Sequence, residues 1–270
     1  MKRQQTRPAR LRIQACIEQH VGDRTEQQDR VVVLGTEPGA PVALGVLADG
    51  LGGRSGGSLA ADNVVLTASQ RLREFVPGRS DPVDFFRSLV QESHTILRLS
   101  AVTSGTQPHS TLAAVLMQPD RIDWCHVGDS RIYHIRDRRL MHCTADHTYA
   151  EELIRKGLLS RDRAHLHPRA GMLVNALGSA RTPEPTFGRL DEPQPGDTFL
   201  LCSDGLWNYF HAGEIVLVLH EAEPADAART LVGRARERAA GMGDNCSLAI
   251  MRFGLAETHG RRTGARPVRA

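Results

Sequence analysis

The sequence contains no apolar run near the roughly 20 residues that cross a lipid bilayer. Its longest apolar stretches span 40–48 and 111–117, and the first residues, MKRQQTRPARLR, lack the apolar middle of a signal peptide. These absences argue against a membrane-spanning helix and against a secretory leader. We therefore expect a cytoplasmic protein without a membrane span.

Cysteine is scarce and scattered along the chain. The five cysteines are odd in number and form no C-x-x-C pair: Cys16, Cys125, Cys143, Cys202 and Cys246. This pattern argues against a disulfide framework and against a zinc knuckle. Most of the cysteines lie in apolar segments, so we interpret them as small hydrophobic residues of the core.

Positive charge is concentrated at the two ends of the chain. The total formal charge is +3, but residues 1–12 carry +5 and residues 257–270 carry +3, so the body between them carries −5. A nucleic-acid reader carries its basic face within the fold, and we therefore predict no specific nucleic-acid partner. The acidic body suits a domain that binds cations or handles phosphate. For the basic ends, solvated tails are favoured over a contact with nucleic acid or membrane.

Hydrophobic periodicity predicts an α+β protein. The strand candidates are 11–20, 30–35, 42–48, 111–118, 121–127, 131–136, 139–143, 197–202 and 246–253. The helix candidates are 58–75, 82–99, 149–158, 212–219 and 224–239. Strand runs followed by helix pairs indicate two antiparallel sheets covered by helices. No linker-like break interrupts residues 11–254, so we expect one domain over this range, flanked by basic tails at 1–10 and 255–270.

Four aspartates stand beside apolar strand candidates in turns rich in glycine. Asp49 in ADGLGG, Asp129 in HVGDSR and Asp204 in CSDGLW follow a strand candidate, and Asp244 in GMGDNCS precedes one. A single Asp-Gly pair is usually just a turn, but four such turns together favour an oxygen-ligand site for a hard cation. The His and Cys residues of these strings belong to the strand candidates and not to the turns, so Mg²⁺ or Mn²⁺ is favoured over zinc.

Seven short motifs stand in order along the chain. They are Arg24-x-x-x-Gln28-Asp29, ADGLGG at 48–53, HVGDSR at 126–131, TADH at 144–147, ALG at 176–178, CSDGLW at 202–207 and DNCS at 244–247. This ordered series resembles the PPM (PP2C) family of metal-dependent protein phosphatases in its bacterial form. The resemblance covers residues 11 to about 253. It implies a four-layer α-β-β-α sandwich, in agreement with the periodicity.

The resemblance also implies a metal site. Asp49 matches the carboxylate that bridges two Mn²⁺ or Mg²⁺ ions, and the carbonyl of Gly50 matches a backbone ligand of one of them. Asp204 and Asp244 match ligands of the other ion. Asp129 matches a carboxylate that, with Asp204, holds a weaker third ion; the alternative is that it only orders its turn.

Three further positions surround the predicted metal site. Arg24 matches the guanidinium that grips the substrate phosphate, a task suited to its planar, always charged fork; a surface arginine is the alternative. Asp29 matches an acid that orients metal-bound waters. Gln28 replaces the acid common at that position, so one water-mediated link to the metals is expected to be weaker.

Three features at or beside the motifs remain as candidates for a functional role: His126, His147 and the segment 148–169. We interpret both histidines as structural, because the metals are already supplied with oxygen ligands. The segment 148–169 corresponds to a flap beside the active site, whose basic residues either steer an acidic phosphopeptide or form a solvated loop.

The implied function is hydrolysis of phosphoserine and phosphothreonine in proteins by a water that two metal ions activate. Such a phosphoric monoester hydrolase opposes a bacterial Ser/Thr kinase, and its expected partners are that kinase and phosphorylated proteins. We expect a monomer. Two alternatives stay open: a catalytically weak regulator that binds phosphoproteins, supported only by Gln28 and by His109 in place of the family's usual glycine, and a phosphoesterase acting on small molecules.

Overall fold

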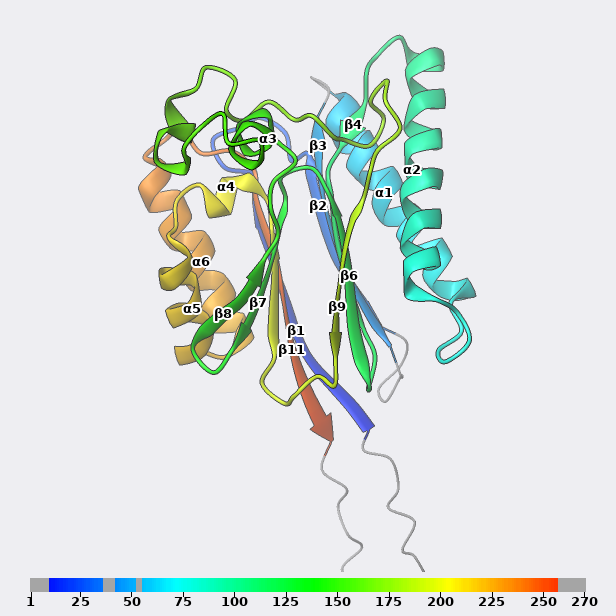
Figure 1. Ribbon diagram of the computed structural model, residues 1–270, viewed down its shortest axis with the longest axis vertical. Coiled ribbons are helices and arrows are strands. Elements are labelled where there is room, and N and C mark those ends of the chain that lie inside the picture. Colours follow the sequence, from blue (N-terminus) through cyan, green and yellow to red (C-terminus); the bar gives the residue numbers. More distant parts are fainter. Residues whose placement is uncertain (1–9, 36–41, 52–54, 257–270) are drawn as a thin grey trace, which may run out of the picture.

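Two antiparallel β-sheets face each other in the computed structural model of the protein (Figure 1), which describes residues 10–35, 42–51 and 55–256. The first sheet has the order β1 (Arg10–His20), β11 (Cys246–Ala256), β10 (Thr198–Cys202), β7 (Arg131–Arg136) and β8 (Arg139–Cys143). The second has the order β2 (Asp29–Gly35), β3 (Ala43–Leu51), β5 (Leu112–Met117), β6 (Arg121–Val127) and β9 (Thr186–Asp191), with β4 (His109–Ser110) paired to the end of β3.

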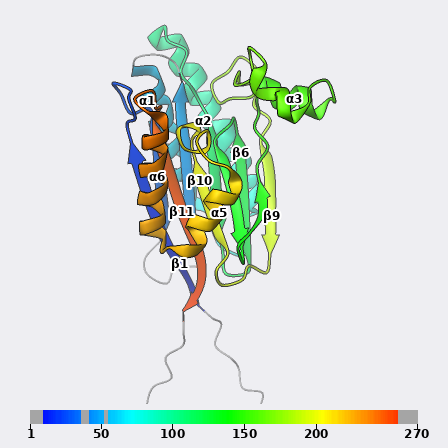
Figure 2. The ribbon, with the colours of Figure 1, turned by 90° about the vertical axis from the view of Figure 1, so that its left-hand side faces the viewer.

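Helices cover the outer face of each sheet. The second sheet is covered by α1 (Ser55–Glu74) and α2 (Pro82–Ser104), and the first by α4 (Asp204–Trp207), α5 (Ala212–Glu221) and α6 (Pro224–Ala239). A further helix, α3 (Tyr149–Arg155), and the 3₁₀ turn η1 (Arg161–Leu166) project beyond the sheets at one end (Figure 2). The predicted α-β-β-α arrangement is confirmed.

Three apolar layers hold the four structural layers together. Along β3, Leu44 and Val46 pack beneath α1 and α2, whereas Leu47 packs between the two sheets. This alternation follows from the period of two in a strand. The middle layer is tight at Gly45, where an added Cβ would lie 2.4 Å from the Sδ of Met251. Burial on both faces explains why the central strands read as continuous apolar runs.

Capping residues and glycines set the ends of α2 and α3. In α2, the side chain of Asp81 accepts a hydrogen bond from the N–H of Val83 at 2.7 Å, and Gly105 ends the helix with a φ of 67°. The helix therefore runs five residues beyond the predicted end. By contrast, α3 ends earlier than predicted, at Arg155, because the chain turns at Gly157 with a φ of 70°.

The short elements β4, β9, α4 and η1 were not predicted. β9 lies at the edge of its sheet, pairs only with β6 and has partly exposed, polar residues, so it lacks the apolar run that marked the other strands. The predicted tails at 1–10 and 255–270 fall outside the described residues, apart from Arg10 and the end of β11. No helix in the described ranges is long and apolar enough to cross a membrane.

All five cysteines are unpaired thiols, and Cys125, Cys202 and Cys246 are buried. Burial raises the pKa of the Cys246 thiol to about 12, and a thiol in this state is a poor nucleophile. The interpretation as core residues is confirmed for these three, whereas Cys16 and Cys143 are half-buried and pack against the edge of the core.

Candidate metal and phosphate site

Five aspartates gather at one end of the sandwich, where strands of both sheets meet. Asp29 begins β2 directly opposite Asp49 of β3, and Asp129 stands in the turn from β6 to β7. Asp204 follows β10, and Asp244 precedes β11, the antiparallel neighbour of β10. Strand pairing thus brings together residues that are up to 215 positions apart. The four aspartates predicted from their turns belong to one cluster.

Asp49 is held at the centre of this cluster. Its N–H donates to the Oγ1 of Thr111 at 2.9 Å, and its carbonyl accepts the N–H of Thr111 at 2.9 Å and the hydroxyl of Ser110 at 3.2 Å. Burial, followed by the charges of Asp29 and Asp204, raises the pKa of the Asp49 carboxyl well above its usual range. A nearby cation would favour the ionised form of this carboxyl.

Asp29 lies behind Asp49 and is almost fully buried. Its Oδ2 accepts a hydrogen bond from the hydroxyl of Ser203 at 2.7 Å. Burial raises the pKa of Asp29 to about 7, although bonds from Ser203 and Ser247 oppose the rise. Because Ser203 follows β10, this bond links the second sheet to the first.

Asp129 and Asp204 complete the inner part of the cluster. Burial, and then repulsion from Asp204, raises the pKa of Asp129 to about 7. Burial, and then repulsion from Asp244, raises the pKa of Asp204 to about 6. The indole N–H of Trp207 donates to the carbonyl of Asp129 at 2.9 Å, so the two aspartate-bearing segments are also connected through hydrogen bonding.

Arg24 lies at the outer rim of the cluster. Its Nη2 donates to the Oδ2 of Asp244 at 2.5 Å, with 61% of the Arg24 side chain and 40% of the Asp244 side chain exposed. The neighbouring Asp23 anchors this loop through Arg236, at 2.8 and 3.0 Å, and through the N–H of Gly243 at 2.6 Å. A guanidinium held there has access both to the carboxylates and to solvent.

Gly50 and Gln28 form the wall of the site beside α1. The N–H of Gly50 donates to the carbonyl of Gln28 at 3.2 Å, and the N–H of Gln28 donates to the Oδ1 of Asn245 at 2.6 Å. A Cβ on Gly50 would lie 1.9 Å from the carbonyl oxygen of Gly57. Only glycine fits this close approach of two backbones.

The donor set suits hard divalent cations. In the described part of the chain, no three His, Cys, Asp or Glu side chains are grouped so as to hold a metal ion together; Asp244 is engaged with Arg24. Mg²⁺ is commonly held by only one or two carboxylates together with carbonyl oxygens and waters. Half-buried carboxylates with mutually raised pKa values, beside the Gly50 backbone, fit that mode of binding, because a cation would relieve their repulsion.

His126 and His147 stack on each other beside the Asp129 turn, with ring centroids 4.5 Å apart. His126 Nε2 lies 2.9 Å from the carbonyl oxygen of Ala145, and His147 Nδ1 accepts the N–H of Gly128 at 3.2 Å. Burial and His126 lower the pKa of His147 to about 4. These contacts hold both rings within the fold, although the buried Nδ1 of His126 has no hydrogen-bond partner among the described residues, and they support the interpretation of both histidines as structural residues.

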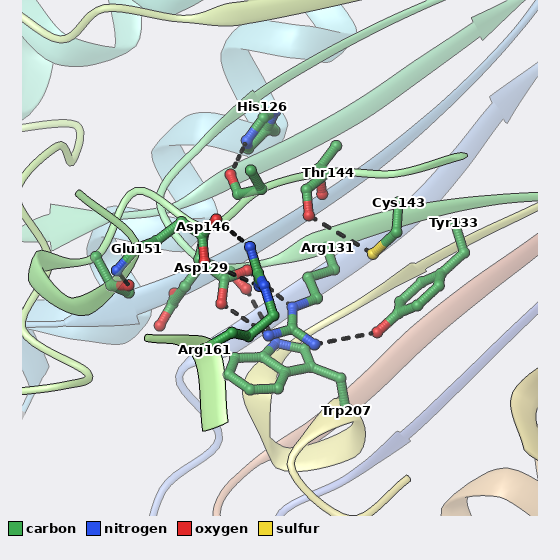
Figure 3. Close-up of polar contacts among 12 residues, drawn as sticks. His126, Asp129, Arg131, Tyr133, Cys143, Thr144, Asp146, Glu151, Arg161 and Trp207 are labelled. Atoms are coloured by element: carbon green, nitrogen blue, oxygen red, sulfur yellow. Dashed lines mark hydrogen bonds and ion pairs between the residues drawn. The ribbon is translucent and has the colours of Figure 1, made fainter. Parts of the chain in front are cut away.

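Three residues of the site were not assigned a role from the sequence: Arg131, Asp146 and Trp207. Each lies inside a motif already quoted, namely HVGDSR, TADH and CSDGLW. The structure brings them into contact next to Asp129 (Figure 3). Their presence in the motifs was the available signal, but no spacing in the sequence predicts this contact.

Comparison with known proteins gives a consistent result. The family described as Protein phosphatase 2C matches residues 18–225. The serine/threonine protein phosphatase PstP of Mycobacterium tuberculosis is 32% identical over 191 residues, which cover 69% of this chain and 36% of PstP. The protein phosphatase PhpP of Streptococcus pneumoniae is 30% identical over 234 residues, covering 84% of this chain and 92% of PhpP. The chain therefore spans about a third of PstP but most of PhpP.

Solved structures show the same similarity. The M. tuberculosis PstP/Ppp structure superposes with a TM-score of 0.77 at 28% identity and covers 89% of this chain and 98% of that one. The catalytic domain of PstP in complex with two manganese ions superposes with a TM-score of 0.76 at 27% identity, covering 90% and 99% of the two chains.

Proposed function

The chain belongs to the protein phosphatase 2C family, and from that membership we propose that it hydrolyses phosphoserine and phosphothreonine residues of proteins in a reaction that requires Mn²⁺ or Mg²⁺. The observation that carries this proposal is the cluster of half-buried carboxylates around Asp49, with the buried Asp29 behind it and Arg24 at its open rim. A cluster of this kind attracts cations, and its rim offers a guanidinium to a phosphate.

The cation-binding residues in this proposal are Asp49, the carbonyl of Gly50, Asp204 and Asp244, with Asp129 and Asp204 available to a weaker third ion. When bound, such ions lower the pKa of water to near neutrality and offset charge on phosphoryl oxygens. Ser203 and Ser247 fix the Asp29 carboxylate, which in turn orients water around the ions.

Arg24 positions the substrate. Its fork pairs with phosphate oxygens in two-pronged geometry, and its exposure allows it to leave Asp244 when a phosphate arrives. Phosphate binding then favours cation binding. When Arg24 turns from Asp244 to the phosphate, the carboxylate of Asp244 becomes available to the cations. The neighbouring Asp23 and Arg236 keep the loop in place during this exchange.

The finer features of the function are proposals of the same kind. We propose a cytoplasmic monomer that opposes a Ser/Thr kinase, with residues 11–254 as the phosphatase domain and basic tails on either side. The PhpP alignment, which covers 84% of this chain and 92% of that relative, supports a phosphatase domain over most of the chain. The names of the bacterial relatives support serine and threonine as the phosphorylated residues.

The test is hydrolysis of a phosphothreonine peptide and of a nucleotide, each with Mn²⁺ and with excess EDTA. We expect Mn²⁺-dependent turnover of the peptide, loss of turnover in EDTA and a much slower reaction with the nucleotide. Asp49→Asn is expected to abolish turnover. Asp123→Asn is the control, since Asp123 is a buried strand aspartate that pairs with Arg121 outside the site.

Each contrary result points to one alternative. Phosphopeptide binding without turnover would indicate a regulator, and preference for the nucleotide would indicate a small-molecule phosphoesterase. Full turnover of the peptide in EDTA would contradict the proposal.

A further inference from the structure

Arg131, the first residue of β7, is held on three sides next to Asp129 (Figure 3). Its Nε and Nη2 donate to the two carboxylate oxygens of Asp146, each at 2.8 Å. Its guanidinium carbon lies 3.5 Å from the centroid of the Trp207 ring, well within cation–π range. Its Nη1 donates to the hydroxyl of Tyr133 at 3.4 Å. The guanidinium therefore has one defined orientation.

Trp207 is connected to both Asp129 and Asp204. It is the last residue of α4, the single turn that begins at Asp204, so the backbone of that turn joins the indole to the Asp204 carboxylate. Its indole N–H donates to the carbonyl of Asp129 at 2.9 Å. One side chain thus fixes the distance between the segments that carry two of the proposed cation ligands.

Asp146 anchors Arg131 to the rest of the fold. The side-chain exposures of Arg131 and Asp146 are 25% and 12%, so this ion pair is largely shielded from water, unlike a surface pair. The adjacent His147 exchanges two hydrogen bonds with Gly128, the residue before Asp129: the N–H of His147 donates at 2.9 Å, and its Nδ1 accepts at 3.2 Å. The segment that supplies Asp146 is therefore bound to the turn that carries Asp129.

The charge of Arg131 has a second effect beside the cluster. Its guanidinium pairs with both carboxylate oxygens of Asp146. Loss of Arg131 would leave the largely shielded Asp146 carboxylate without this cation next to the Asp129 turn.

We propose that Arg131 and Trp207 are positioning residues, which hold Asp129 and Asp204 in the relative placement that binds divalent cations. This inference rests on the proposed phosphatase function and assigns these residues no contact with the substrate. Arg131 fixes the plane of the indole, and the indole fixes the Asp129 turn relative to Asp204. Outer partners that orient metal ligands in this way typically change metal affinity by about 10- to 100-fold when they are removed.

The variants Trp207→Phe and Arg131→Lys test this inference. Phenylalanine keeps a ring beneath Arg131 but removes the donor to Asp129, and lysine keeps the charge but loses the two-pronged bond and the stacking. Trp124→Phe and Arg136→Lys are the matched controls. Trp124 packs on Phe199 between the sheets, and Arg136, on the same strand as Arg131, forms an equivalent two-pronged pair with Asp197.

The primary measurement is calorimetric titration of the metal-free, full-length protein with Mn²⁺, accompanied by thermal unfolding. We expect both test variants to fold and to bind at least one Mn²⁺ about tenfold more weakly, while the controls stay within about threefold of wild type. Turnover should require correspondingly more Mn²⁺ for half-maximal rate and recover at saturating Mn²⁺, with KM for the phosphopeptide unchanged.

Suppose that the wild type is an active Mn²⁺-dependent phosphatase and that Trp207→Phe and Arg131→Lys fold and bind Mn²⁺ with wild-type affinity. This result would overturn the positioning role of Arg131 and Trp207 and leave the proposed function intact. A wild type that neither binds Mn²⁺ nor hydrolyses the phosphopeptide would overturn the proposed function and this inference with it. If Trp207→Phe does not fold, Arg131→Lys decides, because it leaves the indole in place.

Discussion

Asp129→Asn should stabilise the metal-free protein at alkaline pH, although it removes a proposed metal ligand. Burial and the charge of Asp204 raise the folded-state pKa of Asp129 from 3.8 to about 7. A carboxyl whose pKa is raised by folding prefers to be protonated in the folded state, so its ionisation opposes folding. The penalty begins as pH rises above the unfolded pKa of 3.8 and is complete above about 7.

The size of the penalty follows from the shift, at about 1.4 kcal/mol for each pKa unit. For Asp129 this amounts to up to about 4 kcal/mol at pH 8 and to about 1 kcal/mol at pH 4.5. Asparagine has nearly the same shape and no charge. In EDTA, the free energy of unfolding of Asp129→Asn should therefore exceed that of wild type by several kcal/mol at pH 8, with most of the gain lost at pH 4.5.

The assay is urea unfolding of the full chain in EDTA at both pH values, with Asp197→Asn as the control of opposite sign. Burial would raise the pKa of Asp197, but bonds from His134 and Arg136 lower it to about 2. Its contribution is present above the unfolded pKa of 3.8 and lost as pH falls toward 2, so Asp197→Asn should cost about 2 kcal/mol at pH 8. An Asp129→Asn protein no more stable than wild type at pH 8 would refute the account of the cluster as mutually repelling charges.

Three further substitutions test other parts of the site. Arg24→Ala should lower kcat/KM about 10- to 150-fold, which corresponds to roughly 1.5–3 kcal/mol of transition-state stabilisation, and Arg24→Lys should recover part of the loss. If Arg24→Ala instead shifts the Mn²⁺ affinity by more than about tenfold and leaves the substrate dependence unaltered, Arg24 does not bind the phosphate. Asp204→Asn should reduce turnover by more than about 100-fold and leave the protein folded, and unchanged turnover or an unfolded chain would contradict this. Gly50→Ala should lower the free energy of unfolding by about 1–3 kcal/mol or more, because the new Cβ would meet the carbonyl of Gly57. Gly35→Ala is the control: nothing lies within 4 Å of its new Cβ, so the free energy of unfolding should change little.

The sequence was sufficient for the features that depend on local order along the chain. The strands β3 and β10 are buried on both faces, so their apolar runs were visible without any knowledge of the partner strands. Asp49 and Asp204 follow these runs directly and stand next to glycine. Their place at a sheet end was therefore predictable from the sequence.

Features that depend on contacts between distant segments could not be predicted in this way. The ion pair of Arg24 with Asp244 joins residues 220 positions apart, and the contact of Arg131 with Trp207 joins a strand to a separate helical turn. No periodicity relates these positions. β9 was missed for another reason: its sequence, TFGRLD, has only two separated apolar side chains, Phe187 and Leu190, and none of its residues is fully buried.

The carboxylate cluster lies at the junction of the two sheets and belongs to neither sheet alone. Asp29 and Asp49 come from the second sheet, Asp204 and Asp244 come from segments next to strands of the first, and Asp129 lies in the turn that passes from one sheet to the other.

Specific hydrogen bonds cross this junction. Ser203 donates to Asp29, and the N–H of Gln28 donates to Asn245. Below them, Gly45 packs against Met251 with no room for a methyl group. Because protein interiors are packed as densely as crystals and do not deform continuously, this packing sets the spacing of the carboxylates. The cation affinity that we propose for the site would thus depend on how the two sheets pack together, and core positions such as Gly45 and Met251 would contribute to it from outside the carboxylate cluster.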